Sequence, residues 1–152
     1  MKLLLYAALL LFLLGCETEP TLINRPVDYE KVAWDCVGAY VRIDTPQAYD
    51  SLYDSVLVAS PGAAVDCERP TINFDQLTLL GKVIATLGCS PPTVEHNVLK
   101  NEQEKTLTFS SYLETYGDCE RIHLLNEWVL VEKLPSDYVV RYVMTEHNHE
   151  TD

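Results

Sequence analysis

Apolar and polar residues alternate along most of the chain after residue 76, a pattern that predicts β-strands. The expected strands are Leu77 to Leu87, Thr93 to Leu99, Thr106 to Leu113, Glu127 to Lys133 and Tyr138 to Thr145. The polar segment KNEQEK predicts a hairpin turn between the second and third of these strands. The segment KLPSDY predicts a second turn, because its proline cannot donate a hydrogen bond to a central strand pair.

An earlier region predicts one strand followed by one helix, with order beginning near Val32. The residues that alternate in the strand are Val37, Ala39, Val41 and Ile43. Thr45 suits the N-cap of the helix and Pro46 its first position, where a missing N–H costs nothing. The apolar stripe of the helix, which we expect to pack on the core, is Tyr49, Leu52, Tyr53 and Val56. These elements predict one α+β domain over residues 32–146, a mostly antiparallel sheet with one helix packed on a face.

The first 16 residues follow a different pattern, with Lys2 leading into an uninterrupted apolar run. The run is shorter than the roughly 20 apolar residues of a membrane-spanning helix and has the form of an export signal. Its end, Leu13, Leu14, Gly15 and Cys16, resembles the lipobox of bacterial lipoproteins. The resemblance implies cleavage after Gly15 and lipidation of Cys16, which would anchor the chain to a membrane through its acyl chains. An ordinary cleaved signal is the alternative.

The segment after Cys16 predicts a tether, since residues 16–31 hold two prolines and few apolar positions. Residues 147–152 predict a polar tail. We therefore expect a lipid-anchored protein of the bacterial cell envelope, held at the outer membrane. Glu17 and Glu19 resemble the acidic export signals of some surface lipoproteins.

Charge narrows the choice of partners. The chain has 11 Lys and Arg against 23 Asp and Glu, and removal of Lys2 with the signal leaves 11 − 1 = 10 bases and a formal charge of 10 − 23 = −13. Such a surface repels the phosphates of nucleic acids, so we expect no nucleic acid partner. Neutral or cationic partners fit the charge, although the acidity also serves solubility alone.

Four cysteines remain besides Cys16, and an exported protein favours disulfides. Of three possible connectivities, Cys36 with Cys67 and Cys89 with Cys119 is favoured, because each bond joins sequence neighbours and neither crosses the other. The alternative is a zinc site formed by four side chains of suitable type: Cys89, His96, Cys119 and His123. A weak metal contact by His147 and His149 is a further alternative to a frayed tail.

Enzyme motifs are missing from the sequence: it has no G-x-S-x-G, no H-E-x-x-H, no P-loop and no glycine-rich dinucleotide turn. We therefore predict a non-catalytic binding or assembly module without catalytic residues, metal or cofactor. Its partner would be a protein or a surface polymer, bound through a sheet edge or through loops near Pro91 and Pro135. The alternative is a glycosidase or peptidase with a dispersed active site, built from a distant Ser, His and Asp or from carboxylates such as Asp118 and Glu120.

Several segments resemble known proteins. INFDQLTLLGKV, the GCS at Gly88 to Ser90, Cys119 and WVLVEKLPSDYVVRY resemble, in order, a group of small bacterial lipoproteins of unassigned function, over residues 72–143. More remotely, the helix followed by INFDQLTLLG looks like the accessory-subunit domain of a bacterial surface protease complex. Both resemblances imply an exported binding or assembly module, and neither supplies catalytic residues.

Overall fold

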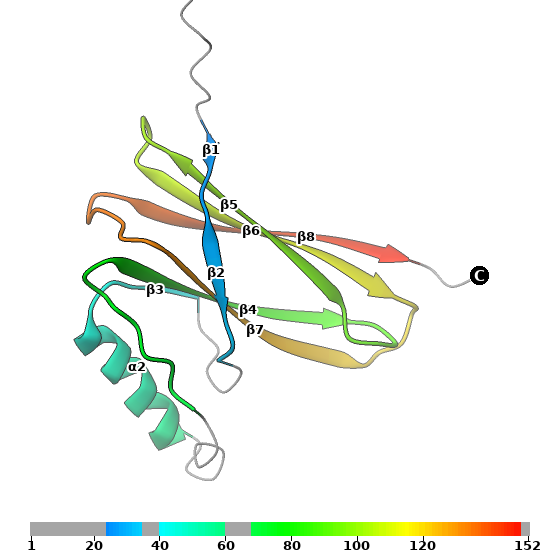
Figure 1. Ribbon diagram of the computed structural model, residues 1–152. Coiled ribbons are helices and arrows are strands. Elements are labelled where there is room, and N and C mark those ends of the chain that lie inside the picture. Colours follow the sequence, from blue (N-terminus) through cyan, green and yellow to red (C-terminus); the bar gives the residue numbers. More distant parts are fainter. Residues whose placement is uncertain (1–23, 35–39, 60–67, 150–152) are drawn as a thin grey trace, which may run out of the picture.

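Eight strands and one helix form in the parts of the chain that the computed structural model describes, residues 24–34, 40–59 and 68–149 (Figure 1). The helix, α2, spans Pro46–Ala59. The strands are β1 (Arg25–Pro26), β2 (Tyr29–Val32), β3 (Val41–Ile43), β4 (Leu77–Leu87), β5 (Thr93–Asn101), β6 (Thr106–Tyr116), β7 (Ile122–Glu132) and β8 (Val139–His149).

The strands form two four-stranded sheets, where the sequence predicts one. One sheet has the order β1-β5-β6-β8 and the other β2-β7-β4-β3. All neighbours are antiparallel except β6 and β8, which are parallel. The prediction of a single sheet is wrong because β4 is apolar on both faces: adjacent Leu79 and Leu80 are both fully buried, so each face needs its own cover.

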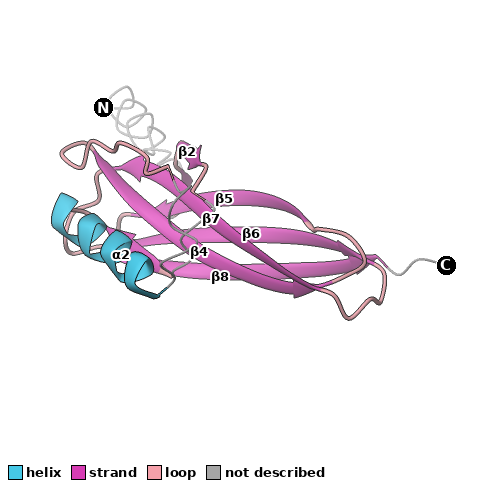
Figure 2. Cartoon of the chain, turned by 90° about the horizontal axis from the view of Figure 1, so that it is seen from below, coloured by secondary structure: helices cyan, strands magenta, loops and turns pink. Residues whose placement is uncertain are grey.

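The molecule consequently has three layers, with α2 outside the sheet of β4 and β7, and the sheet of β5 and β6 on the other side (Figure 2). Between the two sheets, Leu80 and Val129 pack against Val98, Leu107 and Phe109. Between the helix and its sheet lies a cluster of buried aromatic residues: Trp34, Tyr49, Phe74 and Trp128. The helical stripe thus packs on a core, as predicted, through Tyr49 with Leu52 and Tyr53 beside it.

The predicted helix start is confirmed, since Thr45 Oγ1 accepts a hydrogen bond from the Ala48 amide at 3.2 Å and Pro46 is the first helical residue. The predicted hairpin is confirmed in β5 and β6. Its turn is closed by Asn101 Oδ1, which accepts from the amides of Gln103 and Glu104 at 3.0 and 2.9 Å.

Some boundaries differ from the prediction. β7 begins at Ile122, five residues before the expected Glu127, and β8 continues to His149, through the first part of the expected tail. Of the strand expected over residues 37–43, residues 37–39 lie outside the described residues, and β3 forms only from Val41 to Ile43.

The expected tether also ends earlier, because residues 25–32 belong to the domain. Arg25 and Pro26 pair with β5, the Val27 amide donates to Val98 O at 2.9 Å, and β2 pairs with β7. These backbone hydrogen bonds hold the segment in the sheets even though most of its side chains are polar. The rest of the expected tether, up to residue 23, lies outside the described residues, as do the signal and Cys16. None of the described helices has the length and apolar character needed to cross a membrane.

Candidate functional site

The two ends of the strands differ, and the candidate site lies at one of them. The disulfide end is where the loops β4–β5 and β6–β7 and the end of β8 lie, on the right of Figure 1. The helix end is the opposite end, where α2, the β5–β6 turn and the β7–β8 loop lie.

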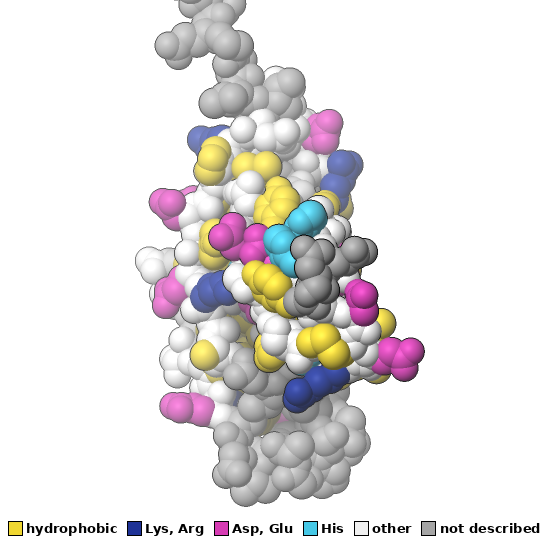
Figure 3. Space-filling view, turned by 90° about the vertical axis from the view of Figure 1, so that its right-hand side faces the viewer, with side chains coloured by type: hydrophobic (Ala, Val, Ile, Leu, Met, Phe, Trp, Pro, Cys, Tyr) yellow, Lys and Arg dark blue, Asp and Glu magenta, His cyan; other side chains and the backbone are white. Residues whose placement is uncertain are grey.

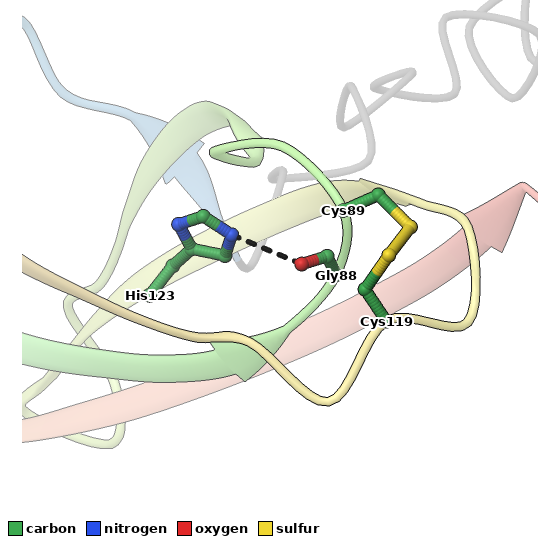
Figure 4. The surroundings of a disulfide bond; sticks show 4 residues. All are labelled: Gly88, Cys89, Cys119 and His123. Carbon is green, nitrogen blue, oxygen red and sulfur yellow. Dashed lines mark hydrogen bonds between the residues drawn. A yellow bond between two sulfur atoms is a disulfide. The ribbon is translucent and has the colours of Figure 1, made fainter.

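A disulfide joins Cys89 to Cys119 and so confirms this predicted pair (Figure 4). Each cysteine lies in a loop that crosses from one sheet to the other, so the bond ties the two crossings together. The Cys89 amide donates to Tyr116 O at 2.8 Å, and His123 Nε2 donates to Gly88 O at 3.1 Å. The second predicted pair, Cys36 with Cys67, lies outside the described residues.

This disulfide contradicts the zinc alternative, because sulfurs joined to each other do not serve as thiolate ligands. The two histidines of that set are also engaged separately, His123 with Gly88 O and His96 with Glu127. A search of the described residues for three or more His, Cys, Asp or Glu that could hold a metal ion finds no such group.

Next to the disulfide lies an exposed apolar surface, which we call the hairpin face. It is the outer side of the disulfide-end halves of β4 and β7. Its exposed residues are Ala85, Leu87, Ile122 and Leu124, and the half-buried Val83 and polar Asn126 lie beside them. Leu87, Ile122 and Leu124 expose 55%, 67% and 70% of their surface. Three neighbouring aliphatic side chains this exposed form the kind of patch that marks an interaction site.

The hairpin face is exposed because the helix covers only the other half of the same sheet side. On this side of β4, Leu79 and Gly81 are buried, whereas Leu87 at the end of the strand is exposed. Over the buried half, the indole of Trp128 lies against Gly81 so closely that a Cβ there would be 2.4 Å from the ring. Trp34 packs against Trp128 with the rings tilted, at 4.8 Å between ring centroids. Cover by the helix and the tryptophans therefore ends before Ala85, which is exposed.

The opposite side of the same two strands is closed. Ile84, Thr86 and His123 point toward the other sheet and expose 0%, 5% and 9% of their surface. The Thr86 hydroxyl donates to a carboxylate oxygen of Glu146 on β8. A partner could therefore reach these two strand halves only on the hairpin face, and not from between the sheets.

Negative charge predominates at the disulfide end. Its strand halves and loops, residues 83–97, 110–126 and 143–149, hold five carboxylates and one cationic side chain, Arg121. The carboxylates are Glu95, Glu114, Asp118, Glu120 and Glu146. Viewed end-on, hydrophobic and histidine side chains gather near the middle, with Asp and Glu around them (Figure 3).

The enzymatic alternative calls for a Ser, a His and an Asp; the structure instead brings a serine, a histidine and a glutamate together, between the sheets. His96 Nδ1 lies 3.1 Å from Ser111 Oγ, and His96 Nε2 lies 2.6 Å from Glu127 Oε2. Burial alone would raise the pKa of the Glu127 carboxyl, but the bond from His96 and the charge of Lys31 outweigh it and lower that pKa. The Ser111 residue is 1% exposed and the His96 side chain 0%, so no substrate reaches this serine in the structure.

Lys82 lies in the same layer and is 1% exposed. Its Nζ donates to Val143 O on β8 and lies 5.8 Å from the ring centroid of Phe109. Burial lowers the pKa of the Lys82 ammonium. The layer of Lys82, His96, Ser111 and Glu127 thus joins the two sheets by polar contacts and has the character of a structural network.

The remaining predicted candidates lie apart from this layer. Asp118 and Glu120 are exposed in the loop that carries Cys119. His147 and His149 are in contact with each other at 4.6 Å between ring centroids, and His149 stacks on Tyr116 at 5.1 Å. They end β8 and are part of a strand rather than of a frayed tail.

A pocket of about 550 Å³ lies at the helix end. It is lined by Arg25 and Lys100, but both cations already bind Glu102, at 2.5 and 3.2 Å. Its third cation, Lys133, donates to the carbonyls of Asp44 and Phe74. Because these cations are satisfied by the protein, the pocket is a weaker candidate than the hairpin face.

Comparison with protein-family models, curated proteins and solved structures finds no match to this chain. The hairpin face is also not evident in the sequence. Ile122 and Leu124 alternate with His123, a pattern that favours the aliphatic residues as core and the histidine as surface. The structure has the reverse arrangement, since His123 is buried.

Proposed function

We propose that this protein is a lipid-anchored module of the bacterial cell envelope that binds a protein partner through the hairpin face, without catalysis. The observation that carries the proposal is the exposure of Leu87, Ile122 and Leu124 beside a disulfide-tied pair of loops. Burying three such side chains in an interface contributes roughly 1.5 to 3 kcal/mol each, before the cost of association is subtracted.

The anchor in this proposal is Cys16, which the lipobox resemblance supports. Eight residues, 17–24, separate Cys16 from the first residue of β1. Fully extended, they reach about 26 to 29 Å. β1 pairs with the helix end of β5, at Leu99 and Lys100. The anchor would therefore hold the helix end near the membrane and leave the disulfide end freer to meet a partner.

A non-catalytic role fits the burial of the one Ser–His–Glu chain found among the described residues. Catalysis would need Ser111 to meet a substrate, and it is 1% exposed. Ser111→Ala should therefore leave partner binding unchanged, while Leu124→Asp should abolish it.

The experiment compares complexes extracted from envelopes in mild detergent. We expect the wild-type protein to migrate as a complex larger than its monomer and Leu124→Asp to migrate as the monomer. Ser51→Asp is the matched control, because Ser51 is exposed on α2 at the other end of the same sheet side. Equal behaviour of the two aspartate variants would contradict the proposal.

The anchor is tested separately by Cys16→Ser, which removes the thiol that receives the lipid. We expect this variant to retain its leader and to carry no lipid, as measured by intact mass and by partition into detergent. A mature, lipid-bearing variant would contradict the anchor without touching the hairpin face.

A further inference from the structure

We infer that His147 and His149 form a two-nitrogen chelate for one divalent ion of the first transition row, and that Cu²⁺ is the ion it binds most tightly. The site lies at the end of β8, away from the hairpin face on β4 and β7, so the inference goes beyond the proposed function and does not depend on it. The sequence offers a metal contact here only as an alternative to a frayed tail, and the structure has a strand in place of that tail.

The two histidines lie on the same side of β8, because successive side chains of a strand point to opposite sides. That side is the outer one. Glu146, which precedes His147, faces inward, since its carboxylate accepts a hydrogen bond from Thr86 on the other sheet. His147 is exposed and His149 is half-buried. An ion in solution therefore has access to the pair, at the end of the molecule where Figure 3 shows histidine side chains on the surface.

The two imidazole rings are already in contact. Their centroids are 4.6 Å apart and their planes make an angle of 85°. An ion of this kind binds each imidazole nitrogen at about 2.0 to 2.1 Å, so two nitrogens on one ion lie about 3 Å apart. Rotation of the exposed His147 about its side-chain bonds brings a nitrogen of each ring to this spacing without movement of the strand.

One of these nitrogens has no partner within the protein. His149 Nε2 is enclosed, and it makes no hydrogen bond with any residue that the structure describes. An enclosed polar atom without a partner is unfavourable, and a bound ion is one way in which such an atom is satisfied. The His149 ring is also held in position, because the Tyr116 ring stacks on it at 5.1 Å between centroids. A ligand that is held in position loses less conformational freedom when the ion binds.

Charge and ligand type select the ion. Glu114 on β6 lies beside His147 in the parallel strand pair, and the chain as a whole has a formal charge of −12, so a cation is favoured. The described residues contain no group of three His, Cys, Asp or Glu that could hold an ion, so water takes the remaining coordination positions. Imidazole suits Zn²⁺, Ni²⁺ and Cu²⁺, and the general order of affinity places Cu²⁺ first among them.

The test titrates the purified mature protein with Cu²⁺ and follows binding by calorimetry and by electron paramagnetic resonance. We expect one equivalent of Cu²⁺ to bind with two imidazole nitrogens as ligands, and Zn²⁺ to compete for the same site with lower affinity. Coordination of the bound Cu²⁺ by a single imidazole, or by none, would overturn the chelate.

A matched variant moves one histidine by a single position. Asn148→His combined with His149→Asn keeps the composition but places the two histidines on opposite sides of the strand. We expect this variant to bind Cu²⁺ at least about tenfold more weakly than the wild type, because the second nitrogen no longer reaches the same ion. Leu124→Asp on the hairpin face should keep the wild-type affinity. Equal affinity of the wild type and the exchanged variant would overturn the inference, and if the exchanged variant fails to fold, the number of imidazoles on the wild-type ion decides.

Discussion

The helix end and the disulfide end solve the same problem, closing the ends of two stacked sheets, by different means. At the helix end the loops are held by two half-buried cations: Arg42 donates to the carbonyls of Leu134, Pro135 and Tyr138, and Lys133 donates to those of Asp44 and Phe74. The same end has the aromatic cluster under α2.

At the disulfide end, one covalent bond between two loops takes the place of that core. Among the residues that the structure describes, the sheet of β4 and β7 is only two strands wide there, since β3 and β2 pair with its other half. A two-stranded ribbon is marginally stable by itself, so its hold on the rest of the molecule matters. We therefore expect the covalent tie to hold this end together while its apolar residues stay uncovered. The following predictions are ordered by the size of the expected effect.

Loss of the disulfide should have the largest effect. In the chain-entropy model a bond across a separation of 30 residues stabilises by roughly 3 to 4 kcal/mol. The double variant Cys89→Ser, Cys119→Ser should lose about this much free energy of unfolding in guanidinium titrations. Amides of the loops near Cys89 should lose exchange protection more than those near Trp128. A loss below about 1 kcal/mol, or equal loss of protection at both ends, would contradict the comparison.

Overpacking the helix end should cost somewhat less. In Gly81→Ala the new methyl group would collide with the buried Trp128 indole, and we expect a destabilisation of about 1 to 3 kcal/mol with an altered near-ultraviolet signal. Gly88→Ala is the matched control at the other end, because its Cβ would meet its nearest atom at 3.4 Å. If both substitutions lower the free energy of unfolding equally, the close contact between Gly81 and Trp128 is not the cause of the destabilisation.

Acid should lower the stability of the protein through protonation of Glu127, which lies in the polar layer between the sheets. Its pKa is lowered in the folded protein, so its stabilisation is present above the ordinary value of 4.5 and is lost as the pH falls through the folded value. The groups that face it are His96 on β5, Lys31 on β2 and Lys82 on β4. Glu127→Gln should cost about 1 to 2 kcal/mol at pH 7, and the difference should shrink below 4.5. A constant difference across this range would show that the charge of Glu127 has no role.

Removing the buried cation should have the smallest effect. A lowered lysine pKa means that the unfolded chain binds more protons, so the stability of the wild type should rise as the pH approaches 10.5. Lys82→Met should abolish that rise and leave stability at neutral pH unchanged or higher by about 1 kcal/mol. Urea titrations at neutral and alkaline pH measure both effects. A large loss at neutral pH would mean that the hydrogen bond to Val143 O is essential.

The contrast between the ends also explains which features the sequence could predict. The limits of β4, the Thr45 cap and the β5–β6 turn follow from local alternation and side-chain capping, and they were predictable. The pairing of β4 with β7 was not, because alternation defines strands but not their neighbours. The hairpin face was not predictable either. Leu79 and Leu87 belong to the same apolar pattern along β4, but Leu79 lies under the cover of α2 and is buried, whereas Leu87 lies beyond it and is exposed.

The Cys89–Cys119 pair was predictable from sequence separation and the expectation of export, whereas the burial of Ser111 with His96 and Glu127 was not. These three residues come from β6, β5 and β7, and their meeting depends on the stacking of the two sheets.

The most direct test of the account is site-specific photo-cross-linking in intact cells. A photoreactive amino acid replaces Leu124 on the hairpin face in one strain and Asp54, which is exposed on α2, in another. The account predicts that the probe at position 124 gives one discrete protein adduct, that this adduct disappears when Ile122→Asp is added, and that the probe at position 54 does not form it. The same adduct from both positions, or no adduct from position 124 while position 54 gives one, would contradict the claim that the disulfide end is the binding end.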